Sequence, residues 1–437
     1  MKGRKLWTIF SSTLVTLLFC LQFIALSAWA VDLQTSGFFT TGVTRTNCDD
    51  GDTYSLYQIN KSTNYFYDGK AGLNFRSRLS DKVDAALQLL GTNMGGKNDL
   101  SLSVDWAFVT YKLLPGLKIQ VGKQFSPAWM IGEYYEVGFL YPWARPVDEV
   151  YIMGSARTIT GGNINYTFML PNGELKAEFI GGKTYYKVPV QKGVTNEATK
   201  FDVFLEGSMT MYMGILTYSN DWALFRAVYS ESKEWDQSLN MENYKTNPTA
   251  TGLGLANTAA NTALASSYGF NMGNYSRKLK GSYSYPRYAF GTKMEYQNFL
   301  LMGEYVDAVL KEGSTKLIDR RAFYGTLGYN WRIFTPSITY AAQDRHNFRN
   351  LLFYNVSTAL NAAAIDEFKD RQESFYLTLL TRTSAKTDIK LQYQRIKTTG
   401  GKSRYNTYPS SGAVGCLQPK GSRDPIGVYS LVFDAIF

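Results

Sequence analysis

The stretch Lys70–Ser80, KAGLNFRSRLS, decides the fold class. Its apolar and small residues fall on one face of an extended strand: Ala71, Leu73, Phe75, Ser77 and Leu79. Its charged and amide residues fall on the other face: Lys70, Asn74, Arg76 and Arg78. A sandwich core cannot accept charges along one whole face, whereas a strand between lipid and water needs this division. The stretch therefore predicts a strand of a transmembrane barrel.

The same two-residue alternation recurs in later parts of the chain. In the segment 288–297, Tyr288, Phe290 and Tyr296 oppose Lys293 and Glu295. Residues 389–394 and 429–437 follow the same pattern, and the chain ends on Phe437. One alternating segment also occurs in soluble sandwiches, but many such segments favour a membrane barrel. In residues 203–218 the faces are ambiguous, because Met209, Met211 and Met213 alternate with Tyr212, Leu216 and Tyr218.

The connections between these segments predict the strand number. Seven short turns are expected near residues 80–82, 114–116, 171–173, 219–221, 297–298, 330–332 and 383–385. Eight longer loops are expected at 44–69, 92–99, 124–157, 186–202, 232–287, 312–319, 344–370 and 398–425. Short turns alternating with long loops are typical of outer-membrane barrels, with the turns periplasmic and the loops external. We predict an all-β fold: a transmembrane antiparallel β-barrel of about sixteen strands, closed so that no edge faces lipid.

The first thirty residues indicate export. Lys2, Arg4 and Lys5 precede an apolar stretch that ends at Ala28-Trp29-Ala30, a small-x-small cleavage pattern. This predicts a signal peptide over residues 1–30 and a mature barrel domain over 31–437. The alternative is a membrane helix, because the apolar stretch is long enough to span.

The third long loop, residues 124–157, is too apolar and aromatic for a tip that stands in water. It contains QFSPAWMIGEYYEVGFLYPWARPVDEVY. Inside a wide barrel, the place to bury such a segment is the inner wall. We therefore expect this loop to fold inward.

The sixteen-strand architecture, the Phe437 terminus and the third loop together resemble the trimeric porins of Gram-negative outer membranes. The resemblance implies a homotrimer and a constriction in which acidic loop residues face a basic wall. The acidic candidates are Glu133, Glu136, Asp148 and Glu149, and the basic candidates are Arg76 and Arg78. Opposed charges across a narrow gap orient polar solutes and disfavour apolar ones. The alternative is that these acids pair with Arg145 and Arg157 and only hold the loop in shape.

Further charged residues are expected to line the lumen, because charges facing lipid are costly. They are Lys70, Lys118, Arg226, Lys293, Glu295 and Lys390. The net charge of +10 has two interpretations, an anion preference of the pore or external contacts with lipopolysaccharide. Acids on the lumen side, among them Asp84, Asp105, Glu178 and Glu304, offset much of this basic charge.

Two cysteines lie in loops that a closed barrel makes neighbours. Cys48 belongs to the first long loop and Cys416 to the eighth. The periplasm is oxidising, so a Cys48–Cys416 disulfide is expected, with two free thiols as the alternative.

Nothing in the sequence indicates catalysis or a cofactor. The single histidine, His346, is expected in an external loop, and neither a metal site nor a haem-attachment motif is present. We predict a passive diffusion channel for small hydrophilic solutes and ions, located in the outer membrane beside lipid and lipopolysaccharide and binding no nucleic acid. The alternatives are a substrate-selective channel, for example one that prefers anions, and a scaffold barrel that holds an electron-transfer partner. Planar-bilayer conductance distinguishes the three.

Overall fold

A computed structural model of the chain describes most of the predicted barrel. It covers residues 32–47, 63, 65, 68–93, 100–151, 157–192, 202–242, 276–280, 283–347, 368–400 and 425–437. The predicted signal peptide and both loop cysteines, Cys48 and Cys416, lie outside the described residues. No helix among the described residues is long and apolar enough to cross a membrane.

Seventeen β-segments account for nearly all of the regular structure. They are β1 (Asp32–Thr46), β2 (Lys70–Ser80), β3 (Val83–Asn93), β4 (Leu100–Leu114), β5 (Leu117–Phe125), β6 (Thr158–Leu170), β7 (Gly173–Lys192), β8 (Asp202–Ser219), β9 (Ala223–Glu242), β10 (Ser276–Lys280), β11 (Tyr283–Tyr296), β12 (Phe299–Glu312), β13 (Thr315–Tyr329), β14 (Phe334–Asn347), β15 (Phe368–Arg382), β16 (Thr387–Gly400) and β17 (Ile426–Ile436). Three short helical turns, η1 (Gly132–Tyr134), η2 (Gly138–Leu140) and α2 (Asp148–Tyr151), lie between β5 and β6.

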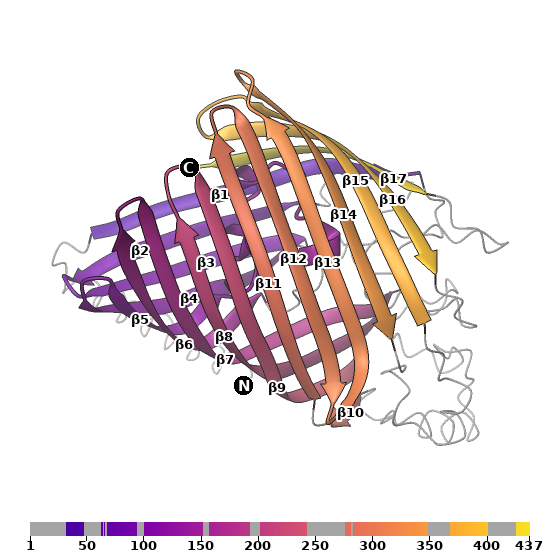
Figure 1. Cartoon of the computed structure of the whole chain (residues 1–437), viewed down its shortest axis with the longest axis horizontal. Coiled ribbons are helices and arrows are strands. Elements are labelled where there is room, and N and C mark those ends of the chain that lie inside the picture. Colours follow the sequence, from indigo (N-terminus) through magenta and orange to yellow (C-terminus); the bar gives the residue numbers. More distant parts are fainter. Residues whose placement is uncertain are drawn as a thin grey trace, which may run out of the picture.

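The strands form one closed antiparallel barrel (Figure 1). β10 and β11 both pair with β9, one after the other, and together form one strand of the barrel. The seventeen segments therefore make sixteen barrel strands. The ring closes where β1 pairs with β17 on one side and with β2 on the other. This confirms the predicted sixteen-stranded all-β barrel. Closure leaves no row of unpaired backbone groups facing lipid.

The C-terminal residue lies at this closure seam. Phe437 N donates to Gly37 O at 3.0 Å, and Gly37 N donates to Phe437 O at 2.9 Å. The Phe437 ring lies against Gly37 so closely that a Cβ there would come within 2.4 Å of it. The terminal aromatic residue therefore completes the seam between the first and last strands.

The predicted short turns agree with the structure, whereas strands extend well into three of the predicted long loops. The predicted loop 186–202 includes the end of β7, and the predicted loop 232–287 includes the end of β9, all of β10 and the start of β11. The predicted loop at 312–319 is wrong, because Gly313 and Ser314 alone join β12 to β13 and Glu312 pairs with Thr315. The polar stretch after Ser314 pairs as strand at the rim, where water solvates its side chains. His346 also lies in a strand, β14, where it pairs with Asp319.

The outer surface has the layered composition of a membrane barrel. Aliphatic side chains form its middle, for example Val121 at 62% exposure and Leu391 at 58%. Aromatic pairs border this band at the turn end (Trp222–Tyr296, Phe299–Tyr329) and toward the loop end (Tyr229–Tyr288, Tyr393–Tyr429). Two aromatic girdles around an apolar band are the signature of a lipid-facing surface.

The two faces of β5 should respond oppositely to charge. Val121→Arg puts a cation on the lipid side at mid-strand and is expected to cost roughly 2–4 kcal/mol of the free energy of unfolding. Lys118→Glu changes a charge on the water-filled side of the same strand and is expected to cost far less. Urea unfolding of protein refolded into lipid vesicles measures both. Equal costs would contradict the assignment of the two faces.

Candidate functional site

The described part of the third loop (L3, residues 126–151 and 157) lies inside the barrel. Its side chains Ile131, Trp143, Val147 and Val150 have no exposed surface. They belong to one apolar cluster with inward-facing residues of the wall: Ile159, Ile180, Met209, Met211, Met213, Ile215, Val228, Met302, Val306, Tyr324 and Tyr376. Burying this apolar surface stabilises the inward path of the loop. The predicted inward fold of the third loop is confirmed.

The methionine face that the sequence left ambiguous is now assigned. Met209, Met211 and Met213 point inward from β8 and are buried, whereas Tyr212 and Leu216 are exposed on the outside. Ser126, at the start of L3, has its Oγ 3.8 Å from Met213 Sδ. Flexible methionine side chains suit an irregular contact of this kind. This part of the lumen wall is apolar because L3 covers it.

Hydrogen bonds fix the middle of L3 to the wall. Trp143 Nε1 donates to Thr326 Oγ1 at 3.1 Å and to Thr339 Oγ1 at 2.9 Å. The Arg145 guanidinium donates to both carboxylate oxygens of Asp68, at 3.0 and 2.9 Å. It also reaches Thr44 Oγ1 at 2.8 Å and Ser430 Oγ at 3.0 Å. Arg145 thus holds L3 against β1, β17 and the segment that precedes β2.

Glu149 and Asp148 lie in α2, on the covered side of the loop. Glu149 has no exposed surface, and its carboxylate accepts hydrogen bonds from Gln372 Nε2 at 2.7 Å, from Tyr376 Oη at 2.8 Å and from Ser374 Oγ. Asp148 is also buried. The geometry makes Glu149 an anchor of L3 on β15.

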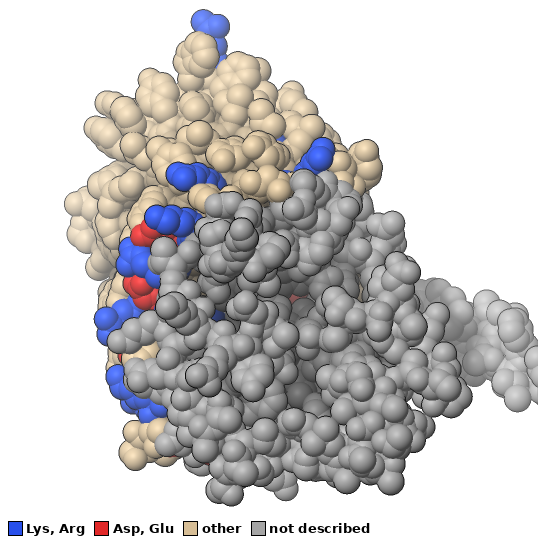
Figure 2. All heavy atoms as spheres, turned by 90° about the vertical axis from the view of Figure 1, so that its right-hand side faces the viewer, with Lys and Arg blue, Asp and Glu red and all other residues tan. Residues whose placement is uncertain are grey.

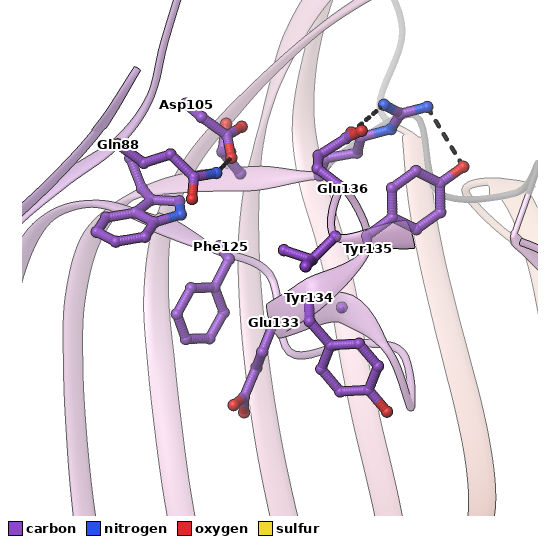
Figure 3. A pocket seen from close by; sticks show the side chains of 12 residues that line it. Gln88, Asp105, Phe125, Glu133, Tyr134, Tyr135 and Glu136 are labelled. Atoms are coloured by element: carbon purple, nitrogen blue, oxygen red, sulfur yellow. Dashed lines mark hydrogen bonds and ion pairs between the residues drawn. The ribbon is translucent and has the colours of Figure 1, made fainter. Parts of the chain in front are cut away.

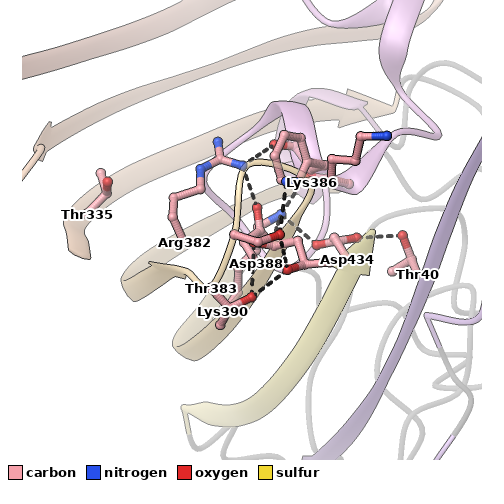
Figure 4. Close-up of polar contacts among 12 residues, drawn as sticks. Thr40, Thr335, Arg382, Thr383, Lys386, Asp388, Lys390 and Asp434 are labelled. Atoms are coloured by element: carbon pink, nitrogen blue, oxygen red, sulfur yellow. Dashed lines mark hydrogen bonds and ion pairs between the residues drawn. The ribbon is translucent and has the colours of Figure 1, made fainter. Parts of the chain in front are cut away.

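The tip of L3 rests on a buried ion cluster (Figure 4). Lys390 Nζ donates to Gly138 O at 2.5 Å and to Asp434 Oδ2 at 2.9 Å. Arg382 Nη1 donates to Asp388 Oδ2 at 2.9 Å and to Phe139 O at 3.3 Å. Gly138 lies so close to Asp434 that a Cβ would come within 2.0 Å of its Oδ1. Lys390 faces inward as expected, but the loop tip covers it completely.

The remaining L3 acids face the other side of the barrel. Glu136 pairs with Arg157 at 2.6 Å and with Lys70 at 3.5 Å. Burial alone would raise the pKa of Glu136, but Arg157 and Lys70 outweigh it and hold this pKa below its ordinary value. Glu133 pairs with Arg226 at 3.3 Å. Both Arg145 and Arg157 are expected partners of the loop acids. Arg157 pairs with Glu136, whereas Arg145 pairs with Asp68, which lies outside L3.

Beside these acids a narrow gap separates L3 from the wall (Figure 3). The loop side carries Glu133, Tyr134, Tyr135, Glu136 and Val137, with Arg157 and Thr158 following. The wall side carries Gln88, Asp105, Trp106 and Phe125 from β3, β4 and β5. Burial raises the pKa of Tyr134 to about 12, so its hydroxyl stays neutral. The lining combines carboxylates, an amide, a guanidinium and aromatic rings.

The other expected lumen residues lie nearer the turn end. Arg78 pairs in register with Asp32 and Asp84, close to the β2–β3 turn. Arg76 has its guanidinium 5.9 Å from the Trp106 ring, so it reaches the wall of the gap. Lys118 is exposed on β5, and Lys293 pairs with Glu295 at 2.8 Å. The structure therefore does not place Arg78 opposite the L3 acids, and only Arg76 approaches the gap.

Sequence reasoning missed several residues that shape this site: Asp68, Gln88, Trp106, Arg382 and Asp434. Asp434 carried a usable signal, because it falls on the inner face of a terminal strand whose outer face is Tyr429, Leu431 and Phe433. No signal in the sequence indicates that Asp434 pairs with Lys390, because this contact depends on the register between β16 and β17.

Comparison with known proteins agrees with this geometry. No protein-family model matches the chain, and no curated protein matches it in sequence. The anion-selective porin from Comamonas acidovorans superimposes with a TM-score of 0.52 at 12% identity, covering 93% of this chain and 100% of the porin. OmpT of Vibrio cholerae, expressed in the outer membrane, gives 0.52 at 11% identity, covering 94% and 99%.

At such identities the likeness is one of fold, and the fold is that of the Gram-negative outer-membrane porins. The predicted resemblance is confirmed at this level. The chain thus has the multi-pass β-barrel fold of these outer-membrane proteins.

The Trp143 anchor yields a stability prediction. Trp143→Ala removes a fully buried ring and should lower the free energy of unfolding by about 3–5 kcal/mol. Trp143→Phe keeps most of the packing and loses the donor to Thr326 and Thr339, which should cost about 1 kcal/mol. Urea unfolding in detergent micelles compares the two variants with the parent. An unchanged stability of Trp143→Ala would contradict the anchoring of L3 on the wall.

The Glu136 ion pairs yield a pH prediction. Because the folded protein lowers the pKa of Glu136, the stabilisation is complete above the ordinary glutamate pKa and is lost as pH falls through the folded value. Glu136→Gln should therefore lower the free energy of unfolding by about 1–3 kcal/mol at pH 7, with a smaller difference from the parent in acid. Urea unfolding at neutral and acid pH measures this difference. Glu133→Gln is the control, because the ion pair of Glu133 is longer than Glu136–Arg157 and the Glu133 side chain is more exposed. If Glu136→Gln lowered the free energy of unfolding equally at neutral and acid pH, the stabilising role of the Glu136 ion pairs would be refuted.

Proposed function

We propose that the protein is a passive channel through which small hydrophilic solutes and ions cross the outer membrane. The observation that carries the proposal is the polar gap between L3 and the β3–β5 wall. On its other sides L3 packs directly against the barrel, through the apolar cluster and the Trp143, Arg145, Glu149 and Lys390 contacts. Solutes therefore pass on the side of Gln88, Asp105 and Trp106.

The lining of the gap favours polar solutes over apolar ones. Charged and amide groups from both sides of the gap replace part of the hydration shell of a polar solute. Apolar molecules cannot form these contacts. Within this proposal Glu133 and Glu136 form the acidic side of the constriction, with Arg76 as the approaching base. Arg78, Lys118, Lys293 and Glu295 belong to the wider periplasmic mouth.

The alternatives receive less support from the geometry. A scaffold barrel needs lumen space for a partner, and L3 occupies that space. An anion-selective channel is known for the Comamonas structure by its description, but the lining of this gap contains three carboxylates and one guanidinium. We also propose that the protein is not an enzyme and carries no cofactor.

The proposed setting is a homotrimer in contact with lipopolysaccharide. Acidic and basic side chains lie close together on one side of the loop end (Figure 2). Partly exposed ion pairs on the described strands include Lys233–Glu231, Arg321–Asp307 and Arg371–Asp344. Such cations suit the phosphates of lipopolysaccharide. Cleavage after Ala30, the trimer and the Cys48–Cys416 disulfide remain predictions.

Conductance of the purified protein in planar bilayers tests the proposal. We expect ohmic steps, and swelling of proteoliposomes in small uncharged sugars but not in large ones. Tyr134→Ala, which removes a ring from the gap lining, should raise the single-channel conductance and the sugar size limit together. Tyr288→Ala on the lipid face is the matched control and should change neither. The absence of any conductance would refute the channel.

A further inference from the structure

One residue of the gap owes its position to an irregularity in the sheet. Gln88 of β3 pairs with Trp106 of β4, while the next residue, Leu89, pairs with Val104. Asp105 is therefore the extra residue of a β-bulge and stands opposite no residue of β3 in the strand register. Bulges re-aim side chains, and they are frequent next to functional sites.

The bulge changes which face Asp105 occupies. In a regular strand, Asp105 would point to the side opposite Trp106, which is the lipid side of Val109 and Tyr111. Instead its carboxylate lines the gap and accepts a hydrogen bond from Gln88 Nε2 at 2.6 Å (Figure 3). The local irregularity thus brings a carboxylate into the solute path.

The other carboxylates of the gap already have cationic partners. Glu136 pairs with Arg157 and Lys70, and Glu133 pairs with Arg226. Asp105 makes no salt bridge with any described residue, and its hydrogen-bond partner is a neutral amide. The nearby cation Lys123 donates instead to the carbonyl of Val104 at 2.5 Å. Asp105 is therefore a carboxylate of the gap that forms no ion pair with a described residue.

The aromatic lining of the gap also suits a cation. Trp106, the next residue along β4, also lines the gap. Phe125 lies on the wall side with Asp105, and Tyr134 and Tyr135 lie on the loop side (Figure 3). The Arg157 guanidinium lies 4.4 Å from the centre of the Tyr135 ring, so this side of the gap already accepts a delocalised cation. Ring faces attract cations electrostatically and offer nothing comparable to anions.

We infer that Asp105, delivered by the β4 bulge, sets the charge preference of the channel and favours small cations, both metal ions and organic ammonium or guanidinium solutes, over anions. The inference rests on the proposed channel function. It assigns the preference to one side chain rather than to the net charge of the chain.

Reversal potentials in a KCl gradient test the inference on the whole protein in planar bilayers. The parent is expected to pass K⁺ in preference to Cl⁻. Asp105→Asn keeps the size of the side chain and should lower the permeability ratio roughly two- to fivefold, the scale set by one charge a few ångströms away across water. Asp84→Asn is the matched control, because it removes one negative charge from the same wall but at Lys112, outside the gap. Its ratio should stay near that of the parent.

The outcomes separate this inference from the channel itself. A parent that prefers Cl⁻, or an Asp105→Asn protein with an unchanged ratio, overturns the role of Asp105 while the channel stands. Absence of conductance in the parent overturns both. If Asp105→Asn fails to assemble, Asp105→Ser provides a second neutral side chain at the position, and a Cl⁻ preference of the parent overturns the inference without any variant.

Discussion

The pairing of every backbone N–H and C=O inside the membrane is the constraint on which the rest of the structure depends. Hydrocarbon offers no partner to an unpaired group, so the sheet must close on itself. Here closure is achieved by β1, which pairs with β2 and β17 at once, and by Phe437 at the seam. A ring of sixteen strands is too wide for wall side chains to fill. The same closure that satisfies the backbone therefore creates the interior into which L3 folds.

Two kinds of contact hold L3 in that interior, and each has a different effect. The apolar cluster around Met213, Met302 and Trp143 provides the burial energy that keeps the loop inside. The buried polar contacts at Arg145, Glu149 and Lys390 are costly to desolvate and are tolerated because each charge is paired or fully hydrogen-bonded. Such contacts accept only one geometry, and they fix where the loop lies. The gap beside β3–β5 has a defined shape because L3 is fixed along its other sides.

The alternation of residues predicted the strands and their faces because lipid and water demand different side chains at every second position. It failed at Met209, Met211 and Met213, where L3 covers the lumen wall and both faces are apolar. It also took residues 312–319 for a loop, since polar side chains at a strand end and in a loop are equally well solvated. The inward path of L3 was predictable from its apolar content, but its partners were not. Which of Glu133, Glu136 and Glu149 faces the gap depends on the path of the loop in three dimensions. The bulge at Asp105 does leave a mark in the sequence, because the outward apolar residues of β4 change from even positions (Leu102, Val104) to odd ones (Val109, Tyr111). The pairing of Gln88 with Trp106 still depends on the register with β3.

The net charge of the chain is a poor guide to what the gap admits. Many of the charges on the described wall are paired, outside as in Arg371–Asp344 and inside as in Lys112–Asp84 and Lys390–Asp434. Salt at physiological strength screens exposed charges beyond about 8 Å, so distant loop residues contribute little to the potential inside the gap. What a solute meets there is the local arrangement, in which Glu133 and Glu136 are held in ion pairs and Asp105 is held by the Gln88 amide. An excess of lysine and arginine over the whole sequence is therefore compatible with a channel whose narrow part carries the opposite sign.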